Sequence, residues 1–231
     1  MVFICKKVEM LKSLISYVFM VGSSCLVENK MKYYIVTLVF ILLISCKEHE
    51  KRALKGETEF QKEMNAGFKD ASTSPLSKKE LKYFKGLDFF PVDDKFKVKA
   101  KFIEAPTKTV FKFPTTTNEI VVYEKYGDVF FTIKGEKFKL NIYKSIGSTK
   151  EYNDHLFLPF LDKSNGKESY GGGRFVDVLT TDVKPDGTVL IDFNKAYNPY
   201  CAYSDKYSCP ITPRSNFIDV AIEAGVKRYK Q

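Results

Sequence analysis

The chain has 231 residues, of which 44% are apolar and 15% aromatic, and it carries a formal net charge of +9. This length suits one globular domain with a short additional segment, and the apolar content excludes a wholly disordered chain. The basic balance does not predict nucleic-acid binding, because only four of the 37 basic residues are Arg, the side chain that best recognises phosphates and base edges.

The first informative element is an apolar stretch of thirteen residues, 33–45, which follows Met31-Lys32 and ends at Cys46. A helix needs about 20 apolar residues to span a bilayer, so this stretch fits the core of a cleavable signal. The run Leu43-Ile44-Ser45-Cys46 is similar to a bacterial lipoprotein signal, in which the cysteine receives lipid. We therefore expect an exported lipoprotein, anchored to a membrane of the bacterial cell envelope through Cys46. A short membrane anchor or a buried helix is the alternative.

These expectations divide the chain into three parts. Residues 1–45 form the signal region, 46–55 a polar tether, and 56–231 a single globular domain. A signal normally lies at the N-terminus, so we interpret residues 1–30 as a mis-called upstream start. A second apolar stretch, Leu11 to Val27, could instead be an additional transmembrane segment.

Two helices are predicted at the start of the globular domain. Phe60, Met64 and Phe68 recur every four residues, which predicts a helix over 56–70. Ser77 and Glu80 have the spacing of a capping box, which predicts a second, shorter helix that ends near residue 84.

After residue 86 the apolar period changes to two. Lysine occupies positions 95, 97, 99 and 101 between apolar residues, which predicts a half-buried strand with a lysine-rich outer face. Further strands are expected at 108–113, 119–125, 129–133, 137–143, 174–181, 188–193 and 216–224, with turns at Gly127-Asp128, 134–136 and 185–187. The pattern predicts a mainly β fold, a sandwich or barrel of about eight strands with an N-terminal helical segment. An α+β arrangement is the alternative.

Two segments, 156–174 and 192–210, do not have a plain strand pattern. The candidate ligand-binding residues in them are Asp162, Tyr170, Arg174, Asp192, Asn194, Tyr197, Asn198 and Tyr203. Three glycines before Arg174 free the backbone for a close approach, so Arg174 could hold an anion, or it could pair with Asp177 or Asp192 as a structural partner. The polar residues of the second segment could line a pocket or satisfy their own turns.

Cys201 and Cys209 are the two cysteines that follow Cys46. In an oxidising compartment such a pair predicts a disulfide, with free thiols or a metal or catalytic role as alternatives. The only histidines are His49 and His155, and His49 falls in the tether, so we predict no metal site and no cofactor.

Four runs of sequence, LFLPFLD, ESYGGGRFVDV, IDFNKAYNPYCAYSDKYSCP and VAIEAGVK, together resemble the bacterial domain of unknown function numbered 1684. The resemblance covers roughly Pro75 to Lys227. It implies a shared fold and kinship, and it implies no reaction.

The sequence favours a lipid-anchored β domain that binds a small or polymeric ligand or an envelope protein. Whether it is an enzyme is open: a Gly-x-Ser-x-Gly elbow and a His-Glu-x-x-His motif are both missing from the sequence. The first alternative is an envelope hydrolase that uses Asp192 or Asp162 as acid or base, with Arg174 to hold negative charge. The second is a purely structural lipoprotein. Convergence of Arg174, Asp192, Asn194 and Tyr203 on one open cavity would favour binding or catalysis, and pairing beneath the surface would favour a structural role.

Overall fold

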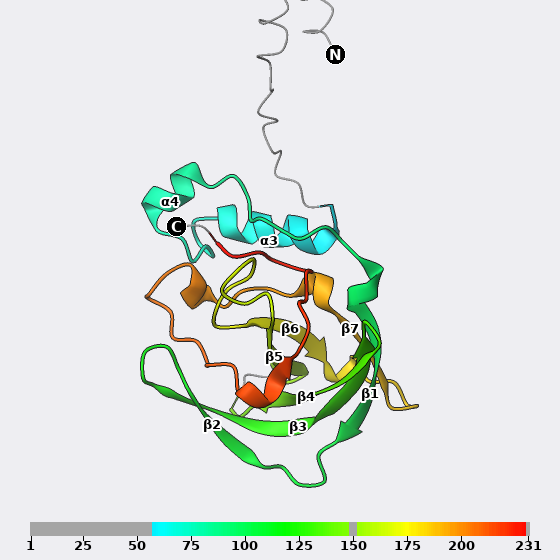
Figure 1. Ribbon diagram of the computed structural model, residues 1–231. Helices are drawn as coiled ribbons and strands as arrows, with labels where there is room; N and C mark the ends of the chain where they lie inside the picture. Colours follow the sequence, from blue (N-terminus) through cyan, green and yellow to red (C-terminus); the bar gives the residue numbers. More distant parts are fainter. Residues whose placement is uncertain (1–56, 148–151, 230–231) are drawn as a thin grey trace, which may run out of the picture. The chain divides into compact units, whose positions relative to one another are not determined.

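The computed structural model describes residues 57–147 and 152–229 (Figure 1). The expected signal region, the tether and Cys46 lie outside these residues, so the predictions of lipidation and of the translation start concern a part of the chain that the structure does not describe. Within the described ranges, no helix has the length and apolar character needed to cross a bilayer.

Both predicted helices are present, as α3 (Glu59–Lys69) and α4 (Lys78–Tyr83), and Figure 1 shows them on the same side of the sheet. The capping box predicted from Ser77 and Glu80 is confirmed, since each side chain accepts the other residue's backbone N–H. Helix α3 buries Phe68 together with the polar Asn65, whose Oδ1 accepts the N–H of Leu87 at 2.7 Å. This bond fixes the segment that follows α4 against α3.

Eight strands form one curled, mainly antiparallel sheet, a half-barrel (Figure 1). The strands are β1 (Lys97–Glu104), β2 (Val110–Pro114), β3 (Ile120–Ile133), β4 (Glu136–Ser145), β5 (His155–Asp162), β6 (Arg174–Leu179), β7 (Thr188–Asp192) and β8 (Phe217–Ile218). Their order is β6-β5-β4-β3-β1-β7, with β2 paired to β3 and β8 paired in parallel to β5. The predicted mainly β class and strand number are therefore confirmed.

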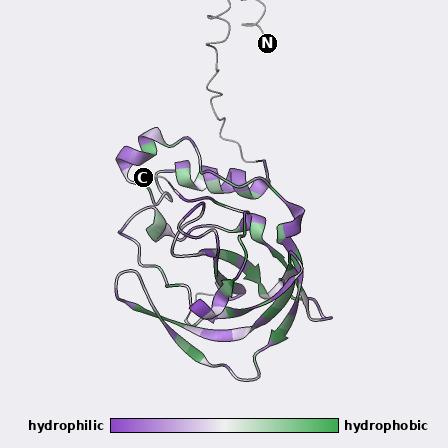
Figure 2. Ribbon diagram, viewed as in Figure 1, coloured by the Kyte–Doolittle hydropathy of each residue, from purple (hydrophilic) through white to green (hydrophobic). Residues whose placement is uncertain are grey.

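The core lies on one face of the curled sheet, because every second side chain of each strand points to that face. It includes Val98, Val129, Leu140, Leu158 and Ile191, all buried. Figure 2 shows hydrophilic and hydrophobic segments on the same strands, as this alternation requires. Burying one such side chain contributes about 1.5–3 kcal/mol, so the strand alternation is the main source of stability.

The turn predicted at Gly127-Asp128 is wrong. Residues 120–133 form one continuous strand, β3, and the register shifts at a bulge between Lys125 and Gly127. A Cβ on Gly127 would lie 2.5 Å from the Phe102 ring and 2.6 Å from the Ile103 carbonyl oxygen. The glycine therefore permits β1 to approach closely and does not mark a chain reversal.

Two other strand predictions differ from the structure. Residues 155–162, which lack a plain strand pattern, form β5 between β4 and β6 and contain Pro159. The strand expected at 216–224 is reduced to β8, Phe217–Ile218. Carbonyl groups further along that segment accept hydrogen bonds from the Arg174 side chain. The Arg174 side chain thus supplies hydrogen bonds that a neighbouring strand would otherwise make.

Candidate functional site

Arg174, the first residue of β6, lies fully buried at the centre of an internal hydrogen-bond network. Its Nη2 is 2.7 Å from Asp162 Oδ2, and both side chains have no solvent-accessible surface. Nη2 also donates to the Ile222 carbonyl at 2.6 Å, and Nη1 donates to the carbonyl of Ala224. The structural partner of Arg174 is therefore Asp162, and the predicted pairing with Asp177 or Asp192 is wrong. Solvent does not reach this guanidinium. Its hydrogen bonds join Asp162, at the end of β5, to the C-terminal segment.

One glycine of the run before Arg174 is required by this arrangement. Gly173 has φ +91°, and a Cβ there would lie 2.7 Å from the Phe160 carbonyl oxygen and 2.8 Å from Thr212 Oγ1. Only glycine tolerates both the backbone conformation and the contact. Gly173 thus permits a tight start to β6 that directs Arg174 inward.

Asp192 and Asn194 form a local turn at the end of β7. Asp192 Oδ1 accepts the backbone N–H of Asn194 at 3.1 Å and its side-chain amide at 2.9 Å. Asn194, in the 3-10 turn Phe193–Lys195, exchanges two hydrogen bonds of 3.0 Å with the backbone of Asp93. The Asp192 side chain thus stabilises the turn, and the Asn194 side chain joins this turn to the segment at Asp93.

Asn198 and Tyr203 are also internal. Asn198 Nδ2 donates to the Tyr203 hydroxyl at 3.2 Å and to the Lys227 carbonyl at 2.9 Å. The Tyr203 ring packs edge-on against Phe68 of α3, with ring centroids 4.7 Å apart. Arg174, the Asp192–Asn194 turn and Tyr203 therefore belong to three separate networks, and the four residues do not converge on one open cavity.

The two cysteines lie close together, with Cys201 inside the 3-10 turn Tyr200–Ala202 and Cys209 in the loop that follows it. The backbone N–H of Cys201 donates to Cys209 Sγ at 3.2 Å, yet both thiols are free, so the predicted disulfide is not formed in this structure. The Tyr170 hydroxyl lies 3.9 Å from Cys201 Sγ. Burial raises the pKa of Tyr170 to about 12, so its hydroxyl stays protonated and can donate to the sulfur.

A pocket of about 600 Å³ opens on the face of β5 and β6 that points away from the core. Its lining comprises Tyr123, Ser145, Gly147, Tyr152, His155, Leu156, Phe157, Asp177 and Tyr197. Of the residues predicted to bind a ligand, only Tyr197 lines it. We call it the aromatic pocket, because four of the lining residues carry phenyl or phenol rings.

The polar group of the aromatic pocket is the carboxylate of Asp177. The Tyr197 hydroxyl donates to Asp177 Oδ1 at 2.7 Å. Tyr197 is itself held by two backbone hydrogen bonds to Phe175, of 2.9 and 3.0 Å. Among the described residues no other hydrogen bond reaches the Asp177 carboxylate, so Oδ2 is available to a ligand.

The surroundings of Asp177 change its acidity. Its side chain is solvent-exposed at the pocket mouth, yet enough protein surrounds it that loss of hydration raises the pKa of the carboxyl. The bond from Tyr197 and the nearby His155 lower this pKa and partly offset the effect. Burial followed by the Asp177 charge raises the pKa of Tyr197 far above its ordinary value, so its hydroxyl remains a donor.

Aromatic side chains build the walls of the pocket. Tyr123 of β3 stacks on Phe157 of β5 with centroids 5.0 Å apart, and Phe175 of β6 meets Phe157 edge-on at 4.7 Å. Tyr152 and His155 lie side by side at the rim, with centroids 5.4 Å apart. A hollow with aromatic walls and one accessible carboxylate suits a ligand that combines an apolar body with a cationic or hydrogen-bond-donating group.

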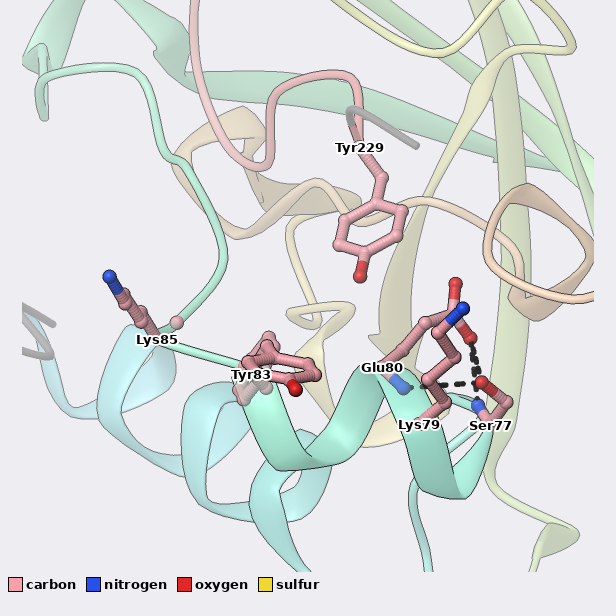
Figure 3. Close-up of a pocket in the computed structure, with 8 residues that line it drawn as sticks. Ser77, Lys79, Glu80, Tyr83, Lys85 and Tyr229 are labelled. Carbon is pink, nitrogen blue, oxygen red and sulfur yellow. Dashed lines mark hydrogen bonds between the residues drawn. The ribbon is translucent and has the colours of Figure 1, made fainter.

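A second hollow, of about 690 Å³, lies between α4 and the C-terminal segment (Figure 3). Tyr83 and Tyr229 contribute aromatic rings to it, and Glu80 is its only carboxylate. Figure 3 shows that Glu80 is bonded to Ser77 in the capping box. Its charged group is therefore committed to the helix, and the aromatic pocket is the stronger candidate.

Sequence reasoning missed most of the aromatic pocket. His155 and Phe157 on β5, and Asp177 on β6, alternate with buried residues such as Leu156 and Val178. A period-two pattern read on both faces of each strand could have singled out these outward positions. The pattern could not have shown that Tyr123 and Tyr197 line the same pocket.

Comparison with known proteins identifies a family but no activity. Residues 82–227 match the family described as "Protein of unknown function (DUF1684)". A solution NMR structure of an uncharacterized protein of Haloarcula marismortui has a TM-score of 0.59 and 27% sequence identity, and the match covers 87% of this chain and 97% of that one. A search of curated proteins found no match.

Proposed function

The chain belongs to the DUF1684 family of proteins of unknown function, and we propose that it is a lipid-anchored, ligand-binding β domain of the bacterial cell envelope whose ligand occupies the aromatic pocket. The observation that carries this proposal is the Asp177 carboxylate, which has one oxygen bonded to Tyr197 and the other available beside aromatic walls.

The chemistry of the pocket defines the class of ligand. A protonated or quaternary amine is attracted to the faces of Tyr and Phe rings and to a carboxylate at the same time. Asp177 supplies the negative charge, and Tyr123, Phe157 and Tyr197 supply ring surface. The ligand is therefore a small amine with apolar substituents, bound without a covalent step.

The binding test compares choline with its uncharged isostere 3,3-dimethylbutan-1-ol, by isothermal titration calorimetry on the purified full chain. We expect choline to bind more tightly than the alcohol, since only choline has a charge for Asp177 to attract. Asp177→Asn should remove this preference. Glu63→Gln, which neutralises an exposed carboxylate on α3, is the matched control and should leave it unchanged.

Equal binding of the two probes, or a choline preference that survives Asp177→Asn, would rule out the amine assignment. Failure of both probes to bind would leave the pocket without its proposed ligand class, and mass spectrometry of small molecules that co-purify with the chain would then identify any other occupant. If no occupant is found, the ligand-binding proposal fails and the purely structural alternative replaces it.

The membrane anchor is supported by the sequence Leu43-Ile44-Ser45-Cys46 after thirteen apolar residues. A diacyl or triacyl cysteine buries more than one chain at about 0.8 kcal/mol per CH₂ group, which is enough for stable attachment. Metabolic labelling with palmitate should therefore mark the protein, and Cys46→Ser should abolish the label. Cys25→Ser is the control, because it removes another cysteine of the N-terminal region. Label that persists in Cys46→Ser would contradict the assignment.

A further inference from the structure

The outer face of β1, β3 and β4 carries a dense group of lysines. Lys97, Lys99 and Lys101 alternate with buried residues along β1, so all three are exposed on the face opposite the core. Lys137 and Lys139 are exposed on β4. We call these five lysines, with the adjoining Phe130 and Leu190, the basic sheet face.

Strand register brings the members of the basic sheet face together. Lys101 lies opposite Phe130, and Phe130 lies opposite Lys139, so these three residues form one row across β1, β3 and β4. Lys99 lies opposite Leu190 of β7. Neighbouring strands are about 4.8 Å apart, so the lysines are close enough to present one field of positive charge.

Few carboxylates neutralise this field. Lys139 lies 3.9 Å from Asp128, which is closer, at 2.8 Å, to Lys125. Within the described residues, Lys97, Lys99, Lys101 and Lys137 form no ion pair. Asp94 is the carboxylate in the hollow of about 660 Å³ on this face, and Asp192 lies opposite Lys97 in the register. Asp186 is a third carboxylate beside this face, since its charge interacts with Lys99. The five lysines still outnumber these carboxylates.

Apolar side chains are exposed between the lysines. Leu190 is 50% exposed and Phe130 is 37% exposed. A surface that contacts lipid uses lysines for the head groups and apolar side chains for the boundary beneath them.

We propose that the basic sheet face binds the anionic head groups of a lipid bilayer. The composition favours lipid over nucleic acid, because the face has no Arg, whose planar fork suits phosphates and bases, and has exposed Leu and Phe. This surface is separate from the aromatic pocket and shares no residue with it. The inference therefore stands or falls independently of the amine ligand.

The absence of Trp from the chain permits a direct test. Leu190→Trp places a single indole in the basic sheet face, and its fluorescence emission shifts to shorter wavelength when it leaves water. The full-length variant is reconstituted in liposomes of phosphatidylcholine alone or of phosphatidylcholine mixed with phosphatidylglycerol. Because the whole chain is present in both, its N-terminal apolar segments contribute equally. Ile211→Trp, at a position that is 48% exposed outside this face, is the control.

We expect a blue shift for Leu190→Trp in the anionic liposomes only, and none for Ile211→Trp. Raising the salt from about 0.1 M to about 1 M shortens the screening length from about 10 Å to about 3 Å and should abolish the shift. Adding Lys97→Gln, Lys99→Gln and Lys101→Gln to this probe variant should weaken the contact on the order of a hundredfold, since each lysine contributes roughly fivefold near an anionic surface.

The matched control for these lysines adds Lys69→Gln, Lys78→Gln and Lys206→Gln, which lower the net charge equally at exposed positions elsewhere. This variant should keep the blue shift. An equal shift in phosphatidylcholine alone, no shift in anionic liposomes, or a shift that survives the β1 substitutions would overturn the proposal. A larger shift with double-stranded DNA than with anionic liposomes at the same salt would overturn it in favour of nucleic acid.

Discussion

Arg174 and Asp162 form an ion pair of 2.7 Å in which neither side chain is accessible to solvent. The pair closes the end of the β5–β6 hairpin, and the same guanidinium holds the carbonyls of Ile222 and Ala224. Arg174, which the sequence indicated as a candidate anion-binding residue, therefore stabilises the fold. The candidate ligand site lies on the outward face of the same two strands, around Asp177.

Replacing Arg174 should reduce stability strongly. Breaking a buried ion pair by removing one partner typically costs about 3–5 kcal/mol, because the other charge is left buried and unpaired. We expect a loss of this size in the free energy of unfolding for Arg174→Ala, measured by urea denaturation. Arg174→Lys should also be destabilising, because one ammonium group cannot reproduce the planar fork that serves Asp162 and two carbonyls.

The control is the pair of Lys163 and Asp219, which are 3.0 Å apart with side chains 55% and 64% exposed. An exposed pair contributes about 1 kcal/mol or less, so Lys163→Ala should change the free energy of unfolding by no more than that. Arg174→Ala with a loss as small as that of Lys163→Ala would contradict the structural role.

The pKa of Asp177 should depend on the two neighbouring side chains, Tyr197 and His155. Loss of hydration raises the pKa of this carboxyl above its ordinary 3.8, and Tyr197 and His155 pull it back. Tyr197→Phe and His155→Gln should each raise the pKa further, and ¹³C NMR of the side-chain carboxyl would measure this. A fall in either variant would show that the contact does not favour the charged form.

The raised pKa of Asp177 predicts that the stability of the protein depends on pH. With a folded-state pKa above the unfolded one, the folded protein holds the Asp177 proton more tightly. Its contribution to stability therefore decreases as pH rises from about 3.8 through the raised value and is constant above it. Choline binding should show the opposite trend and weaken as pH falls through the raised pKa, because protonation removes the charge. Comparing melting curves with those of Asp177→Asn across this range isolates the contribution.

The bulge at Gly127 should tolerate no side chain. A Cβ there would lie 2.5 Å from the Phe102 ring, and overpacking of this kind typically costs about 1–3 kcal/mol. We expect Gly127→Ala to lower the free energy of unfolding by that amount. Gly67→Ala in α3 is the matched control: nothing lies within 4 Å of its Cβ, and alanine should stabilise the helix by up to about 1 kcal/mol. Equal effects at both positions would argue against the close approach of β1.

If the chain is exported as proposed, the cysteine pair should oxidise. Cys201 N lies 3.2 Å from Cys209 Sγ, so a small movement of the loop can bring the two sulfurs together. Oxidation by a periplasmic-type dithiol oxidase would remove two hydrogens and form the S–S bond. Intact mass after alkylation, with and without reductant, measures the outcome. Two alkylated thiols in the unreduced exported protein would show that the pair stays reduced.

The sequence by itself determined the elements whose signals are local. The capping box of Ser77 and Glu80, the turn at 134–136 and the alternation along β1 depend on neighbours within a few residues, and the structure contains all three. Positive φ at Lys134 and Gly135 matches the tight hairpin expected there. The family could be identified for the same reason, because long runs of residues identify it directly.

Only the tertiary structure decided which distant residues meet. The sequence at Gly127 is typical of a turn, but this glycine lies within β3, where β1 pairs closely alongside it. The carbonyls of 222 and 224 bond to an arginine where a strand was expected. Tyr123, Asp177 and Tyr197 lie on separate segments and reach one pocket only because the sheet curls. Local periodicity shows which face a residue occupies, whereas the partner on that face depends on long-range register and curvature.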